Sequence, residues 1–238
     1  ELSEIGGATT GTVTVSNAID ITGSTAQVTA ALVTAGTLVE VTDATVTLND
    51  TPTITQLNDI AAKTTGVVTA TLAANSLANL GALATASTDV ITITVNDNAG
   101  DALTAANLST LGGKTAGTVT VSNAVVITGN HDQLTAALVT AGTKVEVTDA
   151  AVTINDANET AITAAELSAI GGATTGTVTV SNAVVITGDH DQVTAALVTD
   201  ATKVTAATAT VTINDANGTA VAATELSGIG GATTGTVT

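Results

Sequence analysis

The chain has 238 residues with four lysines, no arginine and 21 acidic residues, and its formal net charge is -17. Nucleic acid and anionic membrane surfaces are therefore poor partners, because proteins bind both through clustered cations. Phe, Trp, Tyr, Met and Cys are absent, which argues against the aromatic-lined pocket of an ordinary enzyme domain. Such a composition often indicates disorder, but 44% of the residues are hydrophobic and Val, Ile and Thr alternate over long stretches, so we expect a folded chain.

No stretch approaches the roughly 18 consecutive apolar residues of a transmembrane helix, so membrane insertion is not expected. The chain has neither an initiator Met nor a signal peptide, and we expect residue 1 to be an internal cut or a processed end. The acidic, Thr-rich and Lys-poor composition favours an extracellular or cell-surface location, where divalent cations are plentiful.

Internal repetition is the main feature of the sequence. The segments 108–166 and 167–225 are each 59 residues long and are identical at 42 aligned positions, and residues 1–14 recur as 225–238 with one substitution. A fixed period is typical of an array in which each unit buries its apolar face against its neighbours. We expect one continuous array over 1–238, with units 2–56, 57–107, 108–166 and 167–225 and the start of a further unit at 226–238.

Each unit contains two related halves, and each half begins with two predicted strands. Period-two alternation predicts that the outer residues of each strand point inward. The first strands have the pattern Val-x-Val-x-Asn/Asp and lie at 13–17, 39–43, 119–123, 145–149 and 178–182. The second strands lie at 19–21, 46–48, 125–127, 152–154, 184–186 and 211–213. In the degenerate unit 57–107, which matches the others only with deletions, a second strand is expected to be lost.

A helical segment follows the strands. Residues 133–139 have apolar side chains four apart, followed by Gly142. Thr163 and Glu166 form a capping-box pattern before Leu167, and Gly171-Gly172 is expected to end that helix. We therefore expect short helices of about two turns.

These elements predict a repeat solenoid of about eight coils, predominantly parallel β, with each coil formed by strand, strand and helical turn. Parallel strands stack about 4.8 Å apart, whereas packed helices need about 8–10 Å. The helices must therefore fan outward, as in a leucine-rich-repeat-like fold, or some helical segments must be extended, as in a straight β-solenoid.

Acidic turns recur between the predicted elements. Oxygen ligands repeated in this way are those that calcium prefers, although neither the EF-hand spacing nor the glycine-rich nonapeptide of calcium-binding β-rolls is present. The alternative is that these turns need no metal, and that Asp132 and Asp191 serve as helix N-caps. The candidate calcium ligands are Asp97, Asp101, Asp132, Asp156, Asp189, Asp191 and Asp215.

Three other sets of polar side chains have a structural and a functional interpretation. Asn17, Asn123 and Asn182 end first strands, where we expect them to bond the turn backbone of an adjacent coil rather than a ligand. Outward threonines resemble the lattice of an ice-binding face, but residues of the intervening coils are expected to interrupt it, namely Lys144, Glu146, Lys203 and Thr205. These threonines are Thr12, Thr14, Thr118, Thr120, Thr177 and Thr179.

Val126 and Val185 are expected to point outward, either as a lateral contact between chains or under a neighbouring loop. His131 and His190 are copies of each other beside Asp or Asn, whereas a catalytic site is a unique arrangement of groups. We expect both histidines to be solvated turn residues. We therefore predict no catalytic or cofactor-binding residue and no enzymatic activity.

Residues 170–188, with the sequence Ile-Gly-Gly-Ala-Thr-Thr-Gly-Thr-Val-Thr-Val-Ser-Asn-Ala-Val-Val-Ile-Thr-Gly, resemble tandem repeats of giant cell-surface proteins of marine unicellular cyanobacteria, of the swimming-motility surface protein type. The resemblance implies a secreted, non-enzymatic and calcium-associated role in the cell envelope or matrix. We accordingly expect a structural segment of a large secreted protein that forms a rod, fibre or surface layer, with copies of itself as partners. The alternative is a binding module, an adhesin or ice-binding rod, that uses outward Thr and Asp faces.

Overall fold

The computed structural model describes residues 1–36, 39–140, 142, 144–199 and 203–238. The chain divides into two compact units. Unit 1 contains Glu1–Asn96 and Thr110–Thr120, and unit 2 contains Asp97–Ser109 and Val121–Thr238.

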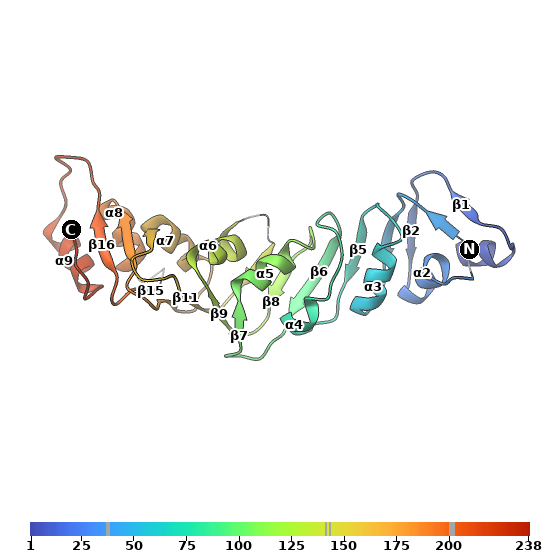
Figure 1. Ribbon diagram of the computed structural model, residues 1–238, viewed down its shortest axis with the longest axis horizontal. Helices are drawn as coiled ribbons and strands as arrows, with labels where there is room; N and C mark the ends of the chain where they lie inside the picture. Colours follow the sequence, from blue (N-terminus) through green and yellow to red (C-terminus); the bar gives the residue numbers. More distant parts are fainter. Residues whose placement is uncertain (37–38, 141, 143, 200–202) are drawn as a thin grey trace. The chain divides into compact units, whose positions relative to one another are not determined.

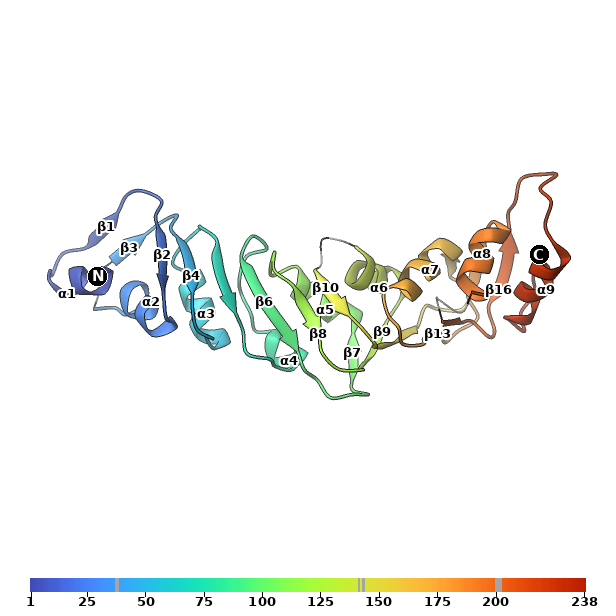
Figure 2. The same cartoon turned by 180° about the vertical axis from the view of Figure 1, so that it is seen from behind.

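Short strands and short helices alternate along the whole chain (Figures 1 and 2). The first part contains α1 Leu2–Gly7, β1 Val13–Val15, β2 Asp20–Gly23, α2 Thr25–Leu32, β3 Val39–Val41, β4 Thr45–Leu48, α3 Ile54–Ala61, β5 Val68–Thr71, α4 Leu77–Leu80 and β6 Val90–Val95. It is followed by β7 Ala102–Thr104, α5 Ala105–Gly112, β8 Val119–Val121, β9 Val126–Gly129, α6 His131–Leu134, the π-helix η1 Thr135–Val139, β10 Val145–Val147, β11 Ala151–Ile154 and β12 Ala161–Thr163. The last part contains α7 Ala164–Gly172, β13 Val178–Val180, β14 Val185–Gly188, α8 His190–Leu197, β15 Val204–Thr205, β16 Thr210–Ile213 and α9 Ala223–Gly231.

Every strand pair recorded between the described residues is parallel. In unit 1, β1 pairs with β3, and the strands β2, β4, β5 and β6 follow one another in a second sheet. Unit 2 contains a five-stranded sheet in the order β15-β13-β11-β9-β7 and a three-stranded sheet in the order β12-β14-β16. The pairing advances by a nearly constant step, since Val126 pairs with Ala102 before it and with Ala151 after it.

The prediction of a single, predominantly β solenoid of about eight coils is wrong. In the described residues the chain is an α/β fold with nine α-helices and four separate parallel sheets of two, six, five and three strands. The alternative in which some helical segments are extended is also wrong for 133–139 and 164–172, which are helical. The leucine-rich-repeat-like and straight β-solenoid forms of the prediction fail with it, because both require one uninterrupted stack.

The physical reason lies in strands that the sequence pattern did not predict. β7 and β12 run directly into α5 and α7, with no residue between strand and helix. β12 starts a new sheet with β14 and β16, while β11 pairs with β9 and β13. A single stack would place each first strand on the next first strand. Instead a second strand, β11, pairs with a first strand, β13, so the sheets are interrupted.

The core consists of aliphatic side chains from strands and helices. Val125 and Ile127 are fully buried while Val126 between them is half-buried, which confirms the predicted alternation at this strand. Helix residues complete the core, with Leu134 and Leu167 fully buried. Small aliphatic residues therefore fill the space between strands and helices without any aromatic side chain.

The capping box predicted at Thr163 is confirmed, since its hydroxyl accepts from the Glu166 amide and the Glu166 side chain accepts from the Thr163 amide. Capping boxes also begin α2, α3, α6 and α8. The predicted stop at Gly171-Gly172 lies within the helix, because α7 includes both glycines and has its C-cap at Ala173.

Candidate functional site

Two aspartates that follow second strands each hold the N-terminus of an earlier helix. Asp156 Oδ2 accepts a hydrogen bond from the His131 backbone amide at 2.7 Å, and Asp215 Oδ2 accepts one from the His190 amide at 3.0 Å. A carboxylate is electrostatically favourable at this end of a helix. These contacts connect segments 25 residues apart in each of the two copies.

The same carboxylates also bind the imidazole rings. His131 Nδ1 lies 2.7 Å from Asp156 Oδ1, and His190 Nδ1 lies 2.7 Å from Asp215 Oδ1. Both histidine side chains are only 13% exposed, so the prediction that they are solvated turn residues is wrong. The hydrogen bond between the partners raises the pKa of His190 and lowers the pKa of Asp215.

Unit 1 contains a related contact without histidine. Asp50 Oδ1 accepts hydrogen bonds from the amide and hydroxyl of Thr25, at 2.7 and 2.5 Å. Both bonds lower the pKa of Asp50, and the bond from the Thr25 hydroxyl has the larger effect. An aspartate at this position therefore serves to hold a helix start, and the histidine ring is an addition in the later copies.

The far nitrogen of each histidine faces a second carboxylate. His131 Nε2 lies 3.4 Å from Asp132 Oδ1, and His190 Nε2 lies 3.5 Å from Asp191 Oδ1. In the second copy Glu225 joins them. Among the described residues, His190, Asp191 and Glu225 form the one group of three or more potential metal ligands with all ligand atoms within 4.8 Å of one another.

The corresponding glutamate of the first copy, Glu166, makes one further hydrogen bond. Glu166 Oε2 accepts from the Thr163 hydroxyl at 2.7 Å and from the Thr163 amide at 3.0 Å, and both bonds lower the pKa of Glu166. In the second copy Ala222 stands in place of Thr163. Among the described residues, the one hydrogen bond recorded for the Glu225 side chain is the bond that Oε2 accepts from the Ala222 backbone amide, at 3.1 Å. The two copies therefore differ in how firmly this carboxylate is held.

The structure does not bring the seven predicted calcium ligands together into one oxygen-rich site among the described residues. Only Asp191 belongs to the three-residue group. Asp156 and Asp215 bind their histidines, Asp132 lies exposed beside His131, and Asp189 caps α8. Asp97 accepts a hydrogen bond through its backbone oxygen, and Asp101 Oδ2 accepts from the Asn98 amide at 2.8 Å. Calcium binding stays a prediction.

The expectation that Asp132 and Asp191 are N-caps is wrong, because the N-caps are Asn130 and Asp189 and the two aspartates lie in the first helical turn.

The structural interpretation of the strand-end asparagines is confirmed for two of them. Asn123 Nδ2 donates to the Asp97 carbonyl at 2.7 Å. Asn182 Nδ2 donates to the Asp156 carbonyl at 2.6 Å.

A recurring Thr-x-Gly turn, which the sequence patterns did not predict, hydrogen-bonds a repeat to the preceding one. The buried Thr174 hydroxyl donates to the Ala150 carbonyl at 2.6 Å and accepts from the Gly176 amide at 3.0 Å. A Cβ at Gly176 would overlap the Ala150 carbonyl oxygen, so only glycine fits this close approach. We call this arrangement the Thr-x-Gly bracket. It recurs at Thr64–Gly66, Thr115–Gly117 and Thr233–Gly235.

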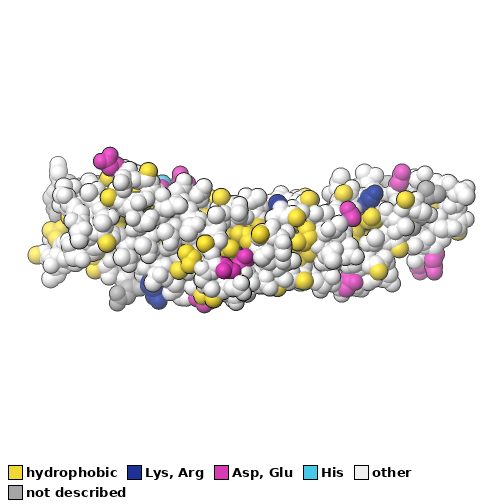
Figure 3. Space-filling view, turned by 60° about the horizontal axis from the view of Figure 1, so that its bottom comes forward, with side chains coloured by type: hydrophobic (Ala, Val, Ile, Leu, Met, Phe, Trp, Pro, Cys, Tyr) yellow, Lys and Arg dark blue, Asp and Glu magenta, His cyan; other side chains and the backbone are white. Residues whose placement is uncertain are grey.

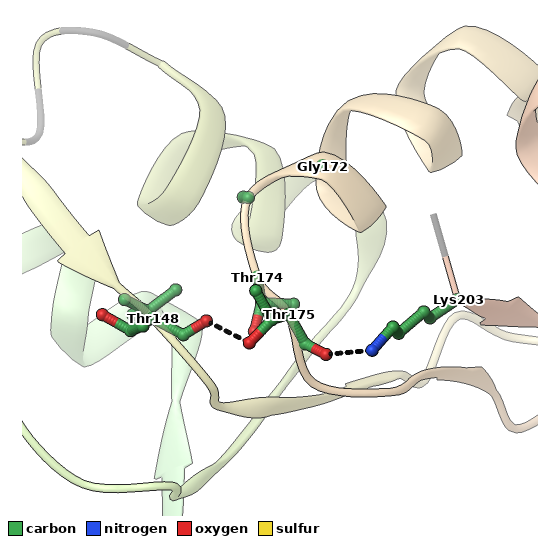
Figure 4. A pocket seen from close by; sticks show the side chains of 7 residues that line it. Thr148, Gly172, Thr174, Thr175 and Lys203 are labelled. Carbon is green, nitrogen blue, oxygen red and sulfur yellow. Dashed lines mark hydrogen bonds between the residues drawn. The ribbon is translucent and has the colours of Figure 1, made fainter. Parts of the chain in front are cut away.

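An open hollow of about 390 Å³ lies beside this turn in unit 2 (Figure 4). Lys203 Nζ donates to the Thr175 carbonyl at 2.9 Å, and the Thr175 hydroxyl donates to the Thr148 carbonyl at 2.9 Å. The described lining contains no carboxylate and no imidazole. The hollow therefore offers no acid–base pair for catalysis.

The outward threonines form a row that differs from the predicted one. Thr177 and Thr179 are exposed, whereas Thr118 and Thr120 are half-buried. Thr179 is paired with Thr153 and Thr205 on the neighbouring strands, so Thr205 continues the row instead of interrupting it. Glu146 lies on β10, which is not part of this sheet, so the interruption predicted from Lys144 and Glu146 stays a prediction. The in-register row across the five-stranded sheet is Thr104, Thr128, Thr153, Thr179 and Thr205.

Val126 and Val185 are half-buried on their strands. Val126 lies between Ala102 and Ala151 in the sheet, and small neighbours on both sides leave its outer surface accessible. Elsewhere on the surface, acidic side chains are dispersed among uncharged ones on the face shown in Figure 3.

Comparisons with protein families, with curated proteins and with solved structures find no match to this chain. Among the described residues, no helix has the length and apolar character needed to cross a membrane.

Proposed function

We propose that the chain is a non-enzymatic structural repeat segment of a large secreted surface protein, and that further copies of the same repeat extend it. The observation that carries this proposal is the exposure of one leucine. Leu167 in α7 is fully buried, whereas the corresponding Leu226 in α9 is 44% exposed.

Helix packing accounts for the difference. In unit 2, α7 packs against η1 and also against α8, and α8 in turn packs against α9. A helix that follows α9 as α8 follows α7 would cover Leu226. In unit 1, Ile5 of α1 is 52% exposed, whereas the corresponding Ile170 of α7 is fully buried. Each of these two helices therefore presents an apolar side chain that a neighbouring repeat covers in the middle of the array.

The strand pairing also supports a further copy of the repeat as the neighbour of α9. Val237 pairs with Val211 of β16, just as Val178 of β13 pairs with Val152 of β11. The Thr-x-Gly bracket at Thr233 is also complete. Because the register is the same in both copies, a second copy of the repeat fits this surface without new chemistry. The acidic composition and the resemblance to cyanobacterial surface repeats favour an extracellular location.

Sedimentation velocity of the full chain over a wide concentration range tests the proposal. We expect concentration-dependent association that Leu226→Glu and Ile5→Glu each reduce at least tenfold. Val90→Glu is the matched control, because Val90 is 40% exposed and belongs to the strand β6 and to neither helix. A chain that stays monomeric at all concentrations, or equal effects of all three variants, would contradict the proposed stacking.

The threonine row favours a second candidate, a binding module for a regularly spaced surface such as ice. Five threonines in register on adjacent parallel strands repeat about every 4.8 Å. Thermal hysteresis that Thr153→Lys and Thr179→Lys abolish would support this function. Thr219→Lys is the control, because Thr219 is exposed outside the row. Absence of hysteresis in the unmodified chain would remove the ice-binding candidate.

A further inference from the structure

The group formed by His190, Asp191 and Glu225 combines the ligand types of a transition-metal site. One imidazole nitrogen and two carboxylates offer three ligand atoms, all within 4.8 Å of one another. An ion with bonds of about 2.0–2.2 Å holds tetrahedral ligand atoms about 3.3–3.6 Å apart. The 3.5 Å distance between His190 Nε2 and Asp191 Oδ1 already fits this geometry.

The surroundings of His190 orient its Nε2 toward the carboxylates of Asp191 and Glu225. Its Nδ1 lies 2.7 Å from Asp215 Oδ1, and its ring is only 13% exposed. When Nδ1 donates to Asp215, Nε2 carries the free lone pair and faces the two carboxylates. Metal-binding histidines usually donate their other ring N–H to a carboxylate, a backbone carbonyl or a water, which fixes the ring and increases its basicity.

The other copy provides an internal comparison. His131, Asp132 and Asp156 reproduce the histidine, its neighbour and the supporting carboxylate. Glu166, however, is held by the hydroxyl of Thr163 at 2.7 Å. Since Ala222 has no hydroxyl, Glu225 Oε2 retains the lone pair with which Glu166 Oε2 accepts the Thr163 hydroxyl.

We propose that His190, Asp191 and Glu225 bind one divalent transition-metal ion, with Asp215 supporting the imidazole, and that Thr163 prevents an equivalent site in the first copy. Imidazole selects zinc-like ions over calcium, which prefers oxygen ligands only. Solvent completes the coordination. The site is independent of the proposed stacking function, because none of the three residues is an apolar side chain of the stacking surface.

Calorimetric titration of the full chain with Zn²⁺ at pH 7.5 tests the proposal. We expect one bound Zn²⁺ per chain, and millimolar Ca²⁺ should not displace it. Asp191→Asn and Glu225→Gln should each weaken binding at least tenfold. Asp132→Asn is the matched control for Asp191→Asn, since the two side chains are 81% and 82% exposed and neither supports the core. His190→Gln should abolish binding, and circular dichroism would verify that this variant is folded.

The difference between the copies gives a second, constructive test. Thr163→Ala should release Glu166 and raise the stoichiometry to two Zn²⁺ per chain. Ala222→Thr should weaken the natural site. Co²⁺ provides a spectroscopic readout, because a nitrogen–oxygen site of low coordination number gives intense visible bands that Glu225→Gln should remove. Zn²⁺ binding unchanged by Asp191→Asn and Glu225→Gln, preference for Ca²⁺, or no binding at all would overturn the proposal.

Discussion

The segments 108–166 and 167–225 are nearly the same sequence in two different surroundings. The leucine that follows each segment shows the difference, because Leu167, after the first segment, is fully buried, whereas Leu226, after the second segment, is 44% exposed. The helix after the histidine is α6 followed by the π-helix η1 in the first copy, and a continuous α8 in the second. Local sequence therefore sets where helices and strands lie, whereas the burial of the leucine depends on the helices that pack against it.

The largest expected difference in the free energy of unfolding is between substitutions at Leu167 and at Leu226. Leu167→Ala should lower the free energy of unfolding by about 2–5 kcal/mol, because it leaves a cavity in a packed core. Leu226→Ala should cost less than about 1 kcal/mol, because this side chain is already partly in water. Chemical denaturation of the isolated monomer measures both values, and equal losses would contradict the assigned environments.

The Thr-x-Gly bracket should have a smaller effect. Thr174→Val removes a donor to the Ala150 carbonyl and the acceptor for the Gly176 amide, and should destabilise the chain by about 1–3 kcal/mol. Thr9→Val is the control, because Thr9 is exposed and accepts only from the Gly11 amide in the hydrogen bonds recorded for it. Thermal melts of the two variants should differ clearly, and the same loss at Thr9 would show that the inter-repeat bond is unimportant.

An exchange at the helix caps should change the free energy of unfolding by about 1 kcal/mol in opposite directions. Thr163→Ala removes the side-chain cap of α7 and should destabilise the chain. Ala222→Thr supplies a cap that α9 lacks and should stabilise it. Denaturation at pH 7 without metal measures both. Stabilisation by Thr163→Ala would contradict the capping role.

The smallest expected effects depend on pH. His190 has its pKa raised above 6.5 and Asp215 has its pKa lowered below 3.8. The histidine contribution is complete below the unfolded pKa and is lost as the pH rises through the raised folded value. The aspartate contribution is present above its unfolded pKa and is lost as the pH falls through the lowered folded value. The pair should therefore stabilise most between about pH 4 and 6.5. The difference in melting temperature between the chain and His190→Gln should become smaller as the pH rises through the raised pKa of His190.

Sequence patterns predicted the positions of most strands and the capped helix at Thr163, because alternation and capping are local properties. The sheet arrangement was not predictable in the same way. Nearly identical Val-Thr-Val strands can pair in several registers, so Val152 meeting Val178 follows from the length of the connecting segments. The strand at Ile162 was missed because Ala161-Ile162-Thr163 buries a single aliphatic side chain, whereas the predicted Val-x-Val strands contain two inward valines.

The candidate site was predicted only in part. The acidic turns around Asp156 and Asp191 were recognised, but the burial of His131 and His190 was not, because it depends on carboxylates 25 residues further along. Two signals were present in the sequence. The histidine and the later aspartate recur together in both copies, and Thr163 becomes Ala222 where the glutamate is retained.

The Thr-x-Gly bracket has a consequence for how such a gene grows. The hydroxyl of Thr174 bonds a main-chain oxygen, that of Ala150, and every amino acid supplies such an oxygen. A duplicated segment can thus attach to any predecessor with the right backbone path, without matched mutations on both sides. Recombination that lengthens or shortens the coding region by whole periods leaves the joints intact, while exposed positions outside the joints and the core can diverge.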